Sequence, residues 1–74
     1  MEKFLIIMPA YNEAKGIESV LKGMESFKDF TVIINDGSTD ETWDIIQKCG
    51  FKGINNGKNY GVAYSIIRGF CYAA

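Results

Sequence analysis

The sequence predicts a three-layer α/β fold, a Rossmann-like parallel sheet with the order βαβαβα, on the strength of three observations. Two short apolar runs, Phe4–Met8 and Thr31–Ile34, are continuous rather than alternating, which is typical of parallel strands covered on both faces. A stretch with apolar residues at helical spacing follows each run. A third, weaker strand at Phe51–Asn55 leads into the clearest helical periodicity of the chain. Strands that alternate with helices indicate a parallel sheet with right-handed crossovers.

The first half of the chain predicts a strand, a turn and a helix. We expect Pro9 to end the first strand and Asn12 to cap the following helix, with Glu13 in its first turn. That helix is expected to end near Ser26 or Phe27. Its inward face consists of the apolar residues at helical spacing, which are Ala14, Ile17, Val20, Leu21 and Met24.

The second half begins with a polar turn, Asn35-Asp36-Gly37, directly after the second strand. Ser38 and Glu41 have the spacing of a capping box, which predicts a helix start there, and Gly50 is expected to end that helix. Its inward residues are Trp43, Ile45, Ile46 and Cys49. The third helix is expected to start near Asn59 or Tyr60, with an apolar stripe made of Ala63, Ile66, Ile67, Phe70, Cys71 and Ala74.

The topology predicts an open edge on the first strand. If the strands lie in the order 3-2-1, the first two helices cover one face and the third helix crosses to the other, toward the first strand. The most hydrophobic strand would then lie at an unpaired edge, which natural proteins avoid. We therefore expect residues 1–74 to form one partial domain, the N-terminal part of a larger fold, or to need an oligomer partner that covers this edge.

Composition limits the classes of function and location. The 74 residues carry a net charge of −1, with scattered Lys and Arg, so nucleic acid is not an expected partner. No run has the length of a signal peptide or a membrane span, which indicates a cytoplasmic chain, with a peripheral position at the cytoplasmic face of the membrane as the alternative. The two cysteines, Cys49 and Cys71, fall on helix stripes and no histidine is present, so we interpret both as buried small hydrophobes in a reducing compartment.

The turn after the first strand limits how a nucleotide would be held. A dinucleotide site needs a glycine-rich loop there, whereas this chain has Met8-Pro9-Ala10-Tyr11-Asn12-Glu13, and no Walker pattern occurs. A bound nucleotide would be held by its base and ribose, with Tyr11 stacking on the base and Asp36 accepting from a ring N–H or a ribose hydroxyl. The alternatives are that Tyr11 is a surface aromatic beside a helix start, and that Asp36 and Asp40 only favour a turn and a helix dipole.

These residues resemble a known family. Pro9-Ala10-Tyr11-Asn12-Glu13 and Asn35-Asp36-Gly37-Ser38-Thr39-Asp40-Glu41-Thr42, together with their spacing, resemble the family 2 glycosyltransferases, GT-A-fold enzymes that use nucleotide-diphosphate sugars. The segment from Asn56 to Ala63, leading into Arg68-Gly69-Phe70, is similar to the family's Asn-x-Gly segment and the helix after it. The resemblance covers nearly the whole chain, and its first two motifs are specific in combination.

The resemblance implies a set of nucleotide-binding residues for a UDP- or GDP-sugar donor. Pro9 would contribute backbone and packing, Tyr11 would contact the base, and Glu13 would lie near the ribose. Asp36 would bond to the base with Ile34 close by. Lys58 and Arg68 are candidates for the phosphate side. The family also implies synthesis of cell-envelope polysaccharide or glycolipid.

The chain departs from the family pattern in two ways. Asn35 stands where the family usually has an aspartate, so a hydrogen-bonding side chain is kept and a charge is lost. The family's Asp-x-Asp metal motif and its catalytic base are absent from these 74 residues, although transfer from a nucleotide diphosphate needs positive charge on the leaving group and inverting transfer needs a base. We expect no catalytic residue, no metal site and no transfer activity in this chain alone. Mg or Mn is expected only in a full-length enzyme.

Two other interpretations remain open at this point. The chain could be a non-catalytic α/β nucleotide-binding module or a remnant that keeps the start of the fold. It could also be an unrelated flavodoxin-like or regulatory domain, in which both motifs are turn chemistry alone.

Overall fold

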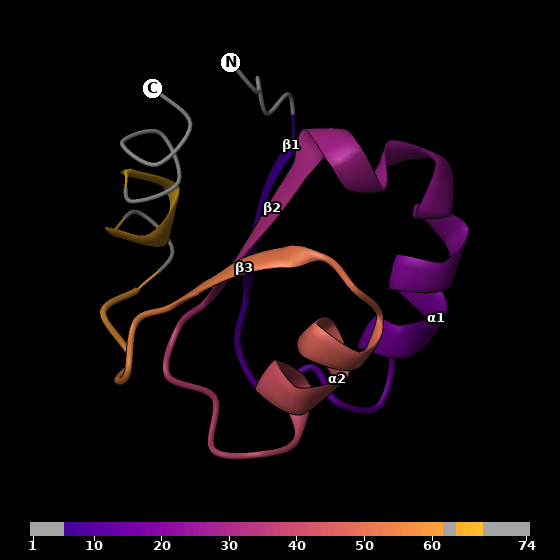
Figure 1. The fold of residues 1–74 in the computed structure, drawn as a ribbon. Helices are drawn as coiled ribbons and strands as arrows, with labels where there is room; N and C mark the ends of the chain where they lie inside the picture. Colours follow the sequence, from indigo (N-terminus) through magenta and orange to yellow (C-terminus); the bar gives the residue numbers. More distant parts are fainter. Residues whose placement is uncertain (1–5, 62–63, 68–74) are drawn as a thin grey trace.

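The computed structural model describes residues 6–61 and 64–67 (Figure 1). A short helical segment, residues 64–67, follows the last strand. The elements in chain order are β1 (Ile6–Ala10), α1 (Ile17–Gly23), the 3-10 helix η1 (Glu25–Phe30), β2 (Thr31–Asn35), α2 (Thr42–Lys48) and β3 (Lys52–Asn55).

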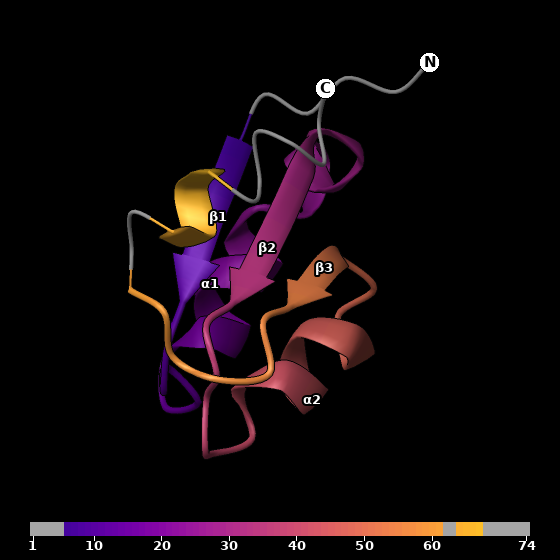
Figure 2. The ribbon, with the colours of Figure 1, turned by 90° about the vertical axis from the view of Figure 1, so that its left-hand side faces the viewer.

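The three strands form a parallel sheet in the order β1-β2-β3, with Ile6 opposite Thr31 and Val32 opposite Lys52. Helices α1 and α2 lie on one face, and the 64–67 helix lies on the other, over β1 (Figures 1 and 2). The predicted three-layer α/β fold is therefore confirmed, together with the strand order and the change of face after β3.

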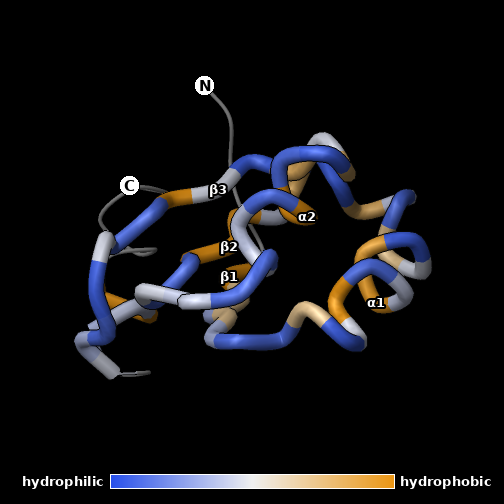
Figure 3. Tube along the Cα trace, turned by 90° about the horizontal axis from the view of Figure 1, so that it is seen from below, coloured by the Kyte–Doolittle hydropathy of each residue, from blue (hydrophilic) through white to orange (hydrophobic). Residues whose placement is uncertain are grey.

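Strand β2 is the centre of the molecule, because all five of its residues are buried. Ile33 belongs to the core on the helical side, whereas Val32 and Ile34, which alternate with it, face the opposite way. Seen from below, the hydrophobic parts of β1 and β2 lie inside a rim of hydrophilic loops (Figure 3). The residues that form this core cluster are Ala10, Ile17, Leu21, Ile33, Ile46 and Phe51.

Strand β1 continues through Pro9 to Ala10, so the prediction that Pro9 ends the strand was wrong. The Asp36 N–H donates to the Ala10 carbonyl at 2.9 Å, so the backbone polar groups of Ala10 face β2. Because these groups alternate along a strand, the backbone polar groups of Pro9 face the outer edge of the sheet. A proline on that side removes no ladder hydrogen bond. Within the described residues β1 pairs with β2 alone and lies at the edge of the sheet, as the predicted strand order requires.

The N-cap of helix α1 lies four residues later in the chain than Asn12, the N-cap that the sequence predicted. Its N-cap is Gly16, and Asn12 has a left-handed backbone with φ 50°. The side-chain Oδ1 of Asn12 accepts from the Thr39 N–H instead of capping a helix. Val20, expected to face inward, is 50% exposed, whereas Ile17 and Leu21 are buried as predicted. The α-helix ends at Gly23, earlier than expected, and η1 completes the connection to β2.

Helix α2 begins at Thr42, and the predicted capping box of Ser38 and Glu41 was wrong. The Thr42 N–H donates to Asp40 Oδ1 at 2.9 Å, while Ser38 Oγ accepts from a different segment, at Asn12. The helix ends as predicted: Gly50 has φ 78°, and the N–H groups of Gly50 and Phe51 donate to the last-turn carbonyls of Gln47 and Ile46.

The 64–67 helix differs from the predicted stripe. Ser65 is fully buried, whereas Ile66 and Ile67 are 37% and 62% exposed. The hydroxyl of Ser65 accepts from Asn56 Nδ2 at 3.1 Å, so the inward position of this turn is polar. The other predicted stripe members and Arg68 lie outside the described residues, as do Phe4 and Leu5.

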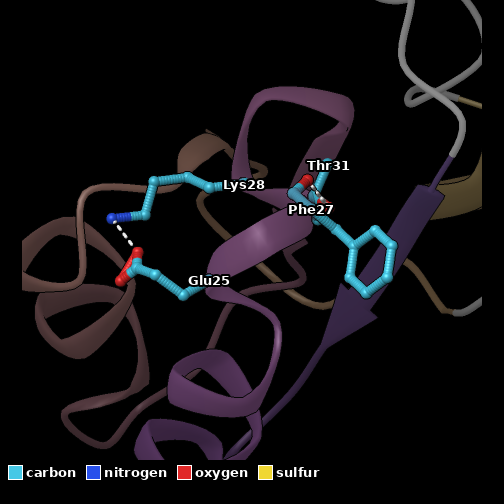
Figure 4. Close-up of polar contacts among 4 residues, drawn as sticks. All are labelled: Glu25, Phe27, Lys28 and Thr31. Carbon is cyan, nitrogen blue, oxygen red and sulfur yellow. Dashed lines mark hydrogen bonds and ion pairs between the residues drawn. The ribbon is translucent and has the colours of Figure 1, made fainter.

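The junction between η1 and β2 contains a buried side-chain bond. Thr31 is fully buried, and its hydroxyl donates to the Phe27 carbonyl at 2.7 Å, while Lys28 and Glu25 form an ion pair nearby (Figure 4). This junction lies at the amino-terminal end of β2, opposite the polar turn that follows Asn35.

Replacing Thr31 by valine tests this bond. Thr31→Val keeps the shape of the side chain but leaves the Phe27 carbonyl without its donor, so we expect the free energy of unfolding to fall by about 1 kcal/mol. Chemical denaturation followed by circular dichroism measures this change. Unchanged stability would show that the hydroxyl contributes nothing to the junction.

Candidate functional site

The candidate site lies at the carboxyl ends of β1 and β2, where parallel α/β sheets bind ligands. A cavity of about 110 Å³ is lined there by Pro9, Ala10, Tyr11, Glu13 and Asp36. Four of the predicted nucleotide-binding residues thus meet at one cavity, although they come from two motifs more than twenty positions apart. Tyr11 is 45% exposed, so its ring is accessible from solvent.

Ile34, the fifth predicted residue, occupies a different place. It is fully buried in β2, pairs in register with Pro9, and does not line the cavity. Its side chain therefore belongs to the packing beneath the site.

Asp36 is buried, and its carboxylate is already bonded to the 56–61 segment. Its Oδ1 accepts from Asn56 Nδ2 at 2.9 Å and from the Tyr60 N–H at 2.8 Å, and its Oδ2 accepts from the Gly61 N–H at 2.8 Å. The Gly61 carbonyl accepts from the Ser65 N–H, so Asp36 holds the backbone where the 64–67 helix begins. The sequence motif did not reveal this anchoring role, because Asn56, Tyr60 and Gly61 are more than nineteen residues away.

These bonds determine the charge state of Asp36. Burial acts to raise the pKa of its carboxyl, but hydrogen bonds from Tyr60, Asn56, Gly61 and Ser65 outweigh burial and hold the pKa below its ordinary value of 3.8. Asp36 is therefore ionised at neutral pH and places a negative charge at the cavity.

Gly37 explains how the turn and the 56–61 segment approach so closely. It has φ 72°, and a Cβ on it would lie 2.2 Å from the Lys58 carbonyl carbon and 2.3 Å from the Asn59 nitrogen. No other residue type fits this contact between two backbones.

Asn35 is the residue whose environment sequence reasoning missed. Its Nδ2 donates to Asn55 Oδ1 at 3.0 Å, and that oxygen is oriented by a 3.1 Å bond from the Gly57 N–H. Asn35 is 2% exposed, and its own Oδ1 is buried with no donor among residues 6–61 and 64–67. Such an unpaired buried acceptor is unfavourable by about 1–3 kcal/mol. The departure from the family's aspartate was the only signal in the sequence that marked this position.

The two motifs are bonded directly to each other. The N–H groups of Asn12 and Glu13 donate to Ser38 Oγ and Thr42 Oγ1 at 3.0 and 2.8 Å, and that of Ala14 donates to Asp40 Oδ2 at 3.3 Å. Three consecutive amides after β1 are therefore occupied by side chains. They are not available to bind a diphosphate, which agrees with the absence of a glycine-rich loop from the sequence.

Asp40 is held in the same network. A hydrogen bond from the Thr42 hydroxyl is the main cause of a lowered pKa for Asp40, and the amides of Thr42 and Ala14 act in the same direction against partial desolvation. Asp40 serves the contact between the motifs and the start of α2.

Lys58, one of the two predicted phosphate-side residues, does not line the cavity. Lys58 is exposed, with its Nζ 5.3 Å from the centre of the Tyr60 ring, and Tyr60 stacks on Tyr64 at a centroid distance of 4.3 Å. Arg68 lies outside the described residues. The assignment of both side chains to phosphate stays a prediction.

The described residues do not fit a divalent cation. In residues 6–61 and 64–67 no three Asp, Glu, Cys or His side chains gather closely enough to hold one, and Asp36 and Asp40 are both engaged by internal donors.

None of the helices in this part of the chain has the length and apolar character that crossing a bilayer requires.

Alanine at two glycines separates close packing from backbone strain. Gly57 also has a positive φ, 82°, but a Cβ there meets nothing within 4 Å. We expect Gly57→Ala to lower the free energy of unfolding by about 1–2 kcal/mol from strain alone. Gly37→Ala is expected to lower it by about 2–5 kcal/mol, because its Cβ also overlaps the 58–59 backbone. Equal losses in urea titrations would contradict the close contact.

Replacing Asp36 by asparagine tests the anchor. Asp36→Asn removes the charge and turns an amide donor toward N–H groups, so we expect a loss of about 2–3 kcal/mol in unfolding free energy at neutral pH. The pKa of Asp36 in the folded chain lies below its unfolded value of 3.8. The difference in unfolding free energy between wild type and Asp36→Asn is therefore fully present above pH 3.8 and is lost as the pH falls through the folded pKa. Unfolding measured across the acid range checks both features.

Asp29→Asn, at an exposed position of η1, is the matched control for that experiment. It should leave the stability at neutral pH nearly unchanged. A gap between wild type and Asp36→Asn that stays constant at all pH values would exclude the charged form of Asp36 as the anchor.

Comparison with known proteins agrees with this geometry. The model of the family described as glycosyl transferase family 2 matches residues 5–74. The chain is also 37% identical over 75 residues to a protein of Methanocaldococcus jannaschii described as uncharacterized protein MJ0544. That match covers 93% of this chain and 33% of the relative, so the chain spans about a third of the relative's length. The chain belongs to glycosyl transferase family 2.

Proposed function

We propose that this chain forms the part of a family 2 glycosyltransferase that binds the nucleoside of a nucleotide-diphosphate sugar donor. The observation that carries the proposal is the convergence of Tyr11, Glu13 and Asp36 on one cavity at the carboxyl ends of β1 and β2. Family membership supports glycosyl transfer as the activity of the whole enzyme.

Each cavity residue has chemistry suited to a nucleoside. The half-exposed ring of Tyr11 offers a flat surface on which a base can stack. Glu13 is exposed and supplies carboxylate oxygens that ribose hydroxyls can donate to. Pro9 forms part of the wall beside them.

Asp36 lines the cavity with a carboxylate that is already hydrogen-bonded within the chain. An ionised carboxylate has about four acceptor sites, and Asp36 accepts hydrogen bonds from Asn56, Tyr60, Gly61 and Ser65. We propose that a ring N–H of a uracil or guanine base shares one of these carboxylate oxygens, as a UDP- or GDP-sugar donor would provide.

The diphosphate and the transfer step need groups beyond this cavity. The amides of residues 12–14 are occupied, so we propose phosphate contacts from Lys58 and Arg68 and, in a full-length enzyme, from Mg or Mn held elsewhere. Asp36 and Asp40 are engaged internally, which leaves neither as a general base. We therefore propose that this chain by itself binds donor without transferring sugar, in the cytoplasm or at the cytoplasmic membrane face, within envelope polysaccharide or glycolipid synthesis.

Tyr11 gives the sharpest test of the site. We expect Tyr11→Ala to weaken binding of UDP or GDP roughly tenfold, because stacking of a base on an aromatic ring contributes about 1–3 kcal/mol. Tyr11→Phe keeps the ring and should bind as wild type does. Titration of the labelled chain with each nucleotide, followed by amide chemical shifts, measures the dissociation constants.

Two results would contradict the proposal. One is the absence of amide shifts at residues 10–13 and 36 in the wild-type chain at millimolar nucleotide. The other is equal affinity in Tyr11→Ala and wild type. Since Tyr11 is half exposed and lies outside the core cluster, loss of folding is not expected to obscure the comparison.

A further inference from the structure

The contact between the two motifs uses a separate set of residues from the cavity. We define the inter-motif clamp as the side chains of Asn12, Ser38, Asp40 and Thr42, which bond the 12–14 segment to the 38–42 segment. None of these four residues lines the cavity, whereas Tyr11 and Glu13, on either side of Asn12, both do. Neighbouring residues of the first motif thus differ in role, since Tyr11 and Glu13 line the cavity and Asn12 bonds to the second motif.

Asn12 both donates and accepts a hydrogen bond in the clamp. Its N–H donates to Ser38 Oγ at 3.0 Å, and its Oδ1 accepts from the Thr39 N–H at 2.8 Å. Its left-handed backbone, with φ 50°, reverses the chain directly between Tyr11 and Glu13. The turn is therefore held by two bonds at the residue where its direction is set.

The other bonds fix the residues that follow. The Glu13 N–H donates to Thr42 Oγ1 at 2.8 Å, and Thr42 also bonds to Asp40 through its hydroxyl and its N–H. Asp40 in turn accepts from the Ala14 N–H. The backbone of Glu13 is thereby attached to the first residue of α2, a helix that packs on the core through Ile46.

We infer that the inter-motif clamp positions Tyr11 and Glu13 for the nucleoside, with Asn12 as the principal positioning residue. The inference rests on the proposed function of the cavity. Without the clamp, the 11–14 loop keeps its residues but loses its attachment to α2 and to the turn after β2. Binding then has to order the loop, which lowers affinity although no ligand contact is removed.

Asn12→Gly is the variant that isolates this role. Glycine adopts the positive φ freely and keeps the N–H bond to Ser38, so only the acceptor for Thr39 is lost. We expect the affinity for UDP or GDP to fall about five- to tenfold, as loss of one or two modest hydrogen bonds predicts. Asn12→Asp keeps an acceptor oxygen and tolerates the left-handed backbone, so it should restore affinity to within about twofold of wild type.

Thr31→Val is the matched control, since it also removes a single side-chain bond but lies at the opposite end of β2. All variants are titrated by amide chemical shifts at a temperature where thermal unfolding shows each to be fully folded. The clamp as a positioning device predicts weaker nucleotide binding in Asn12→Gly and unchanged binding in Thr31→Val. A clamp that merely stabilises the fold predicts unchanged affinity in both.

The outcomes separate this inference from the proposed function. If the wild-type chain binds and Asn12→Gly binds equally well, the positioning role is overturned while the nucleoside site stands. If Asn12→Asp binds as poorly as Asn12→Gly, the acceptor oxygen is not what Asn12 contributes, and the inference is again overturned. If the wild-type chain shows no shifts with UDP or GDP, the proposed function fails and the inference fails with it.

Discussion

The buried carboxylate of Asp36 is the interaction on which the functional end of the molecule depends. It accepts hydrogen bonds from Asn56, Tyr60 and Gly61 at 2.8–2.9 Å, and so it joins the end of β2 to the segment that follows β3. A buried charge is tolerated only with such compensation, because unpaired it would be strongly unfavourable. Gly37 allows this close contact between the two segments, since no side chain fits between its backbone and that of residues 58–59.

The same short motifs hold the fold together and line the cavity. In the first motif, Tyr11 and Glu13 face the cavity while Asn12 bonds to the second motif. In the second, Asp36 faces the cavity and the 56–61 segment, while Ser38 and Asp40 bond back to the first. A conformational constraint of this kind places a binding site on rigid elements, and it explains why polar residues in these loops need not all touch a ligand.

Strand β1 lies at an edge of the three-stranded sheet that the described residues form. The backbone nitrogen of Pro9, which carries no hydrogen, faces this edge and not β2. The 64–67 helix lies on the face of the sheet opposite α1 and α2 (Figure 2). The chain spans about a third of the Methanocaldococcus jannaschii relative. We propose that this part of the family fold binds the sugar donor.

The sequence by itself determined the architecture and the location of the site. Continuous apolar runs, helical spacing and the glycine at position 50 depend on local chemistry, so the strand order and the layers followed from pattern. The set of Pro9, Tyr11, Glu13 and Asp36, which meets at one cavity, came from the resemblance to the family. Only the tertiary structure decided what the polar residues bond to. Asn12 and Ser38 have the composition of helix caps, yet each finds its partner in the other motif. Ser65, rather than Ile66 or Ile67, faces inward, because Asn56 and Asp36 lie beneath it. Such choices depend on groups distant in the chain that compete for the same donors, and local periodicity carries no information about them.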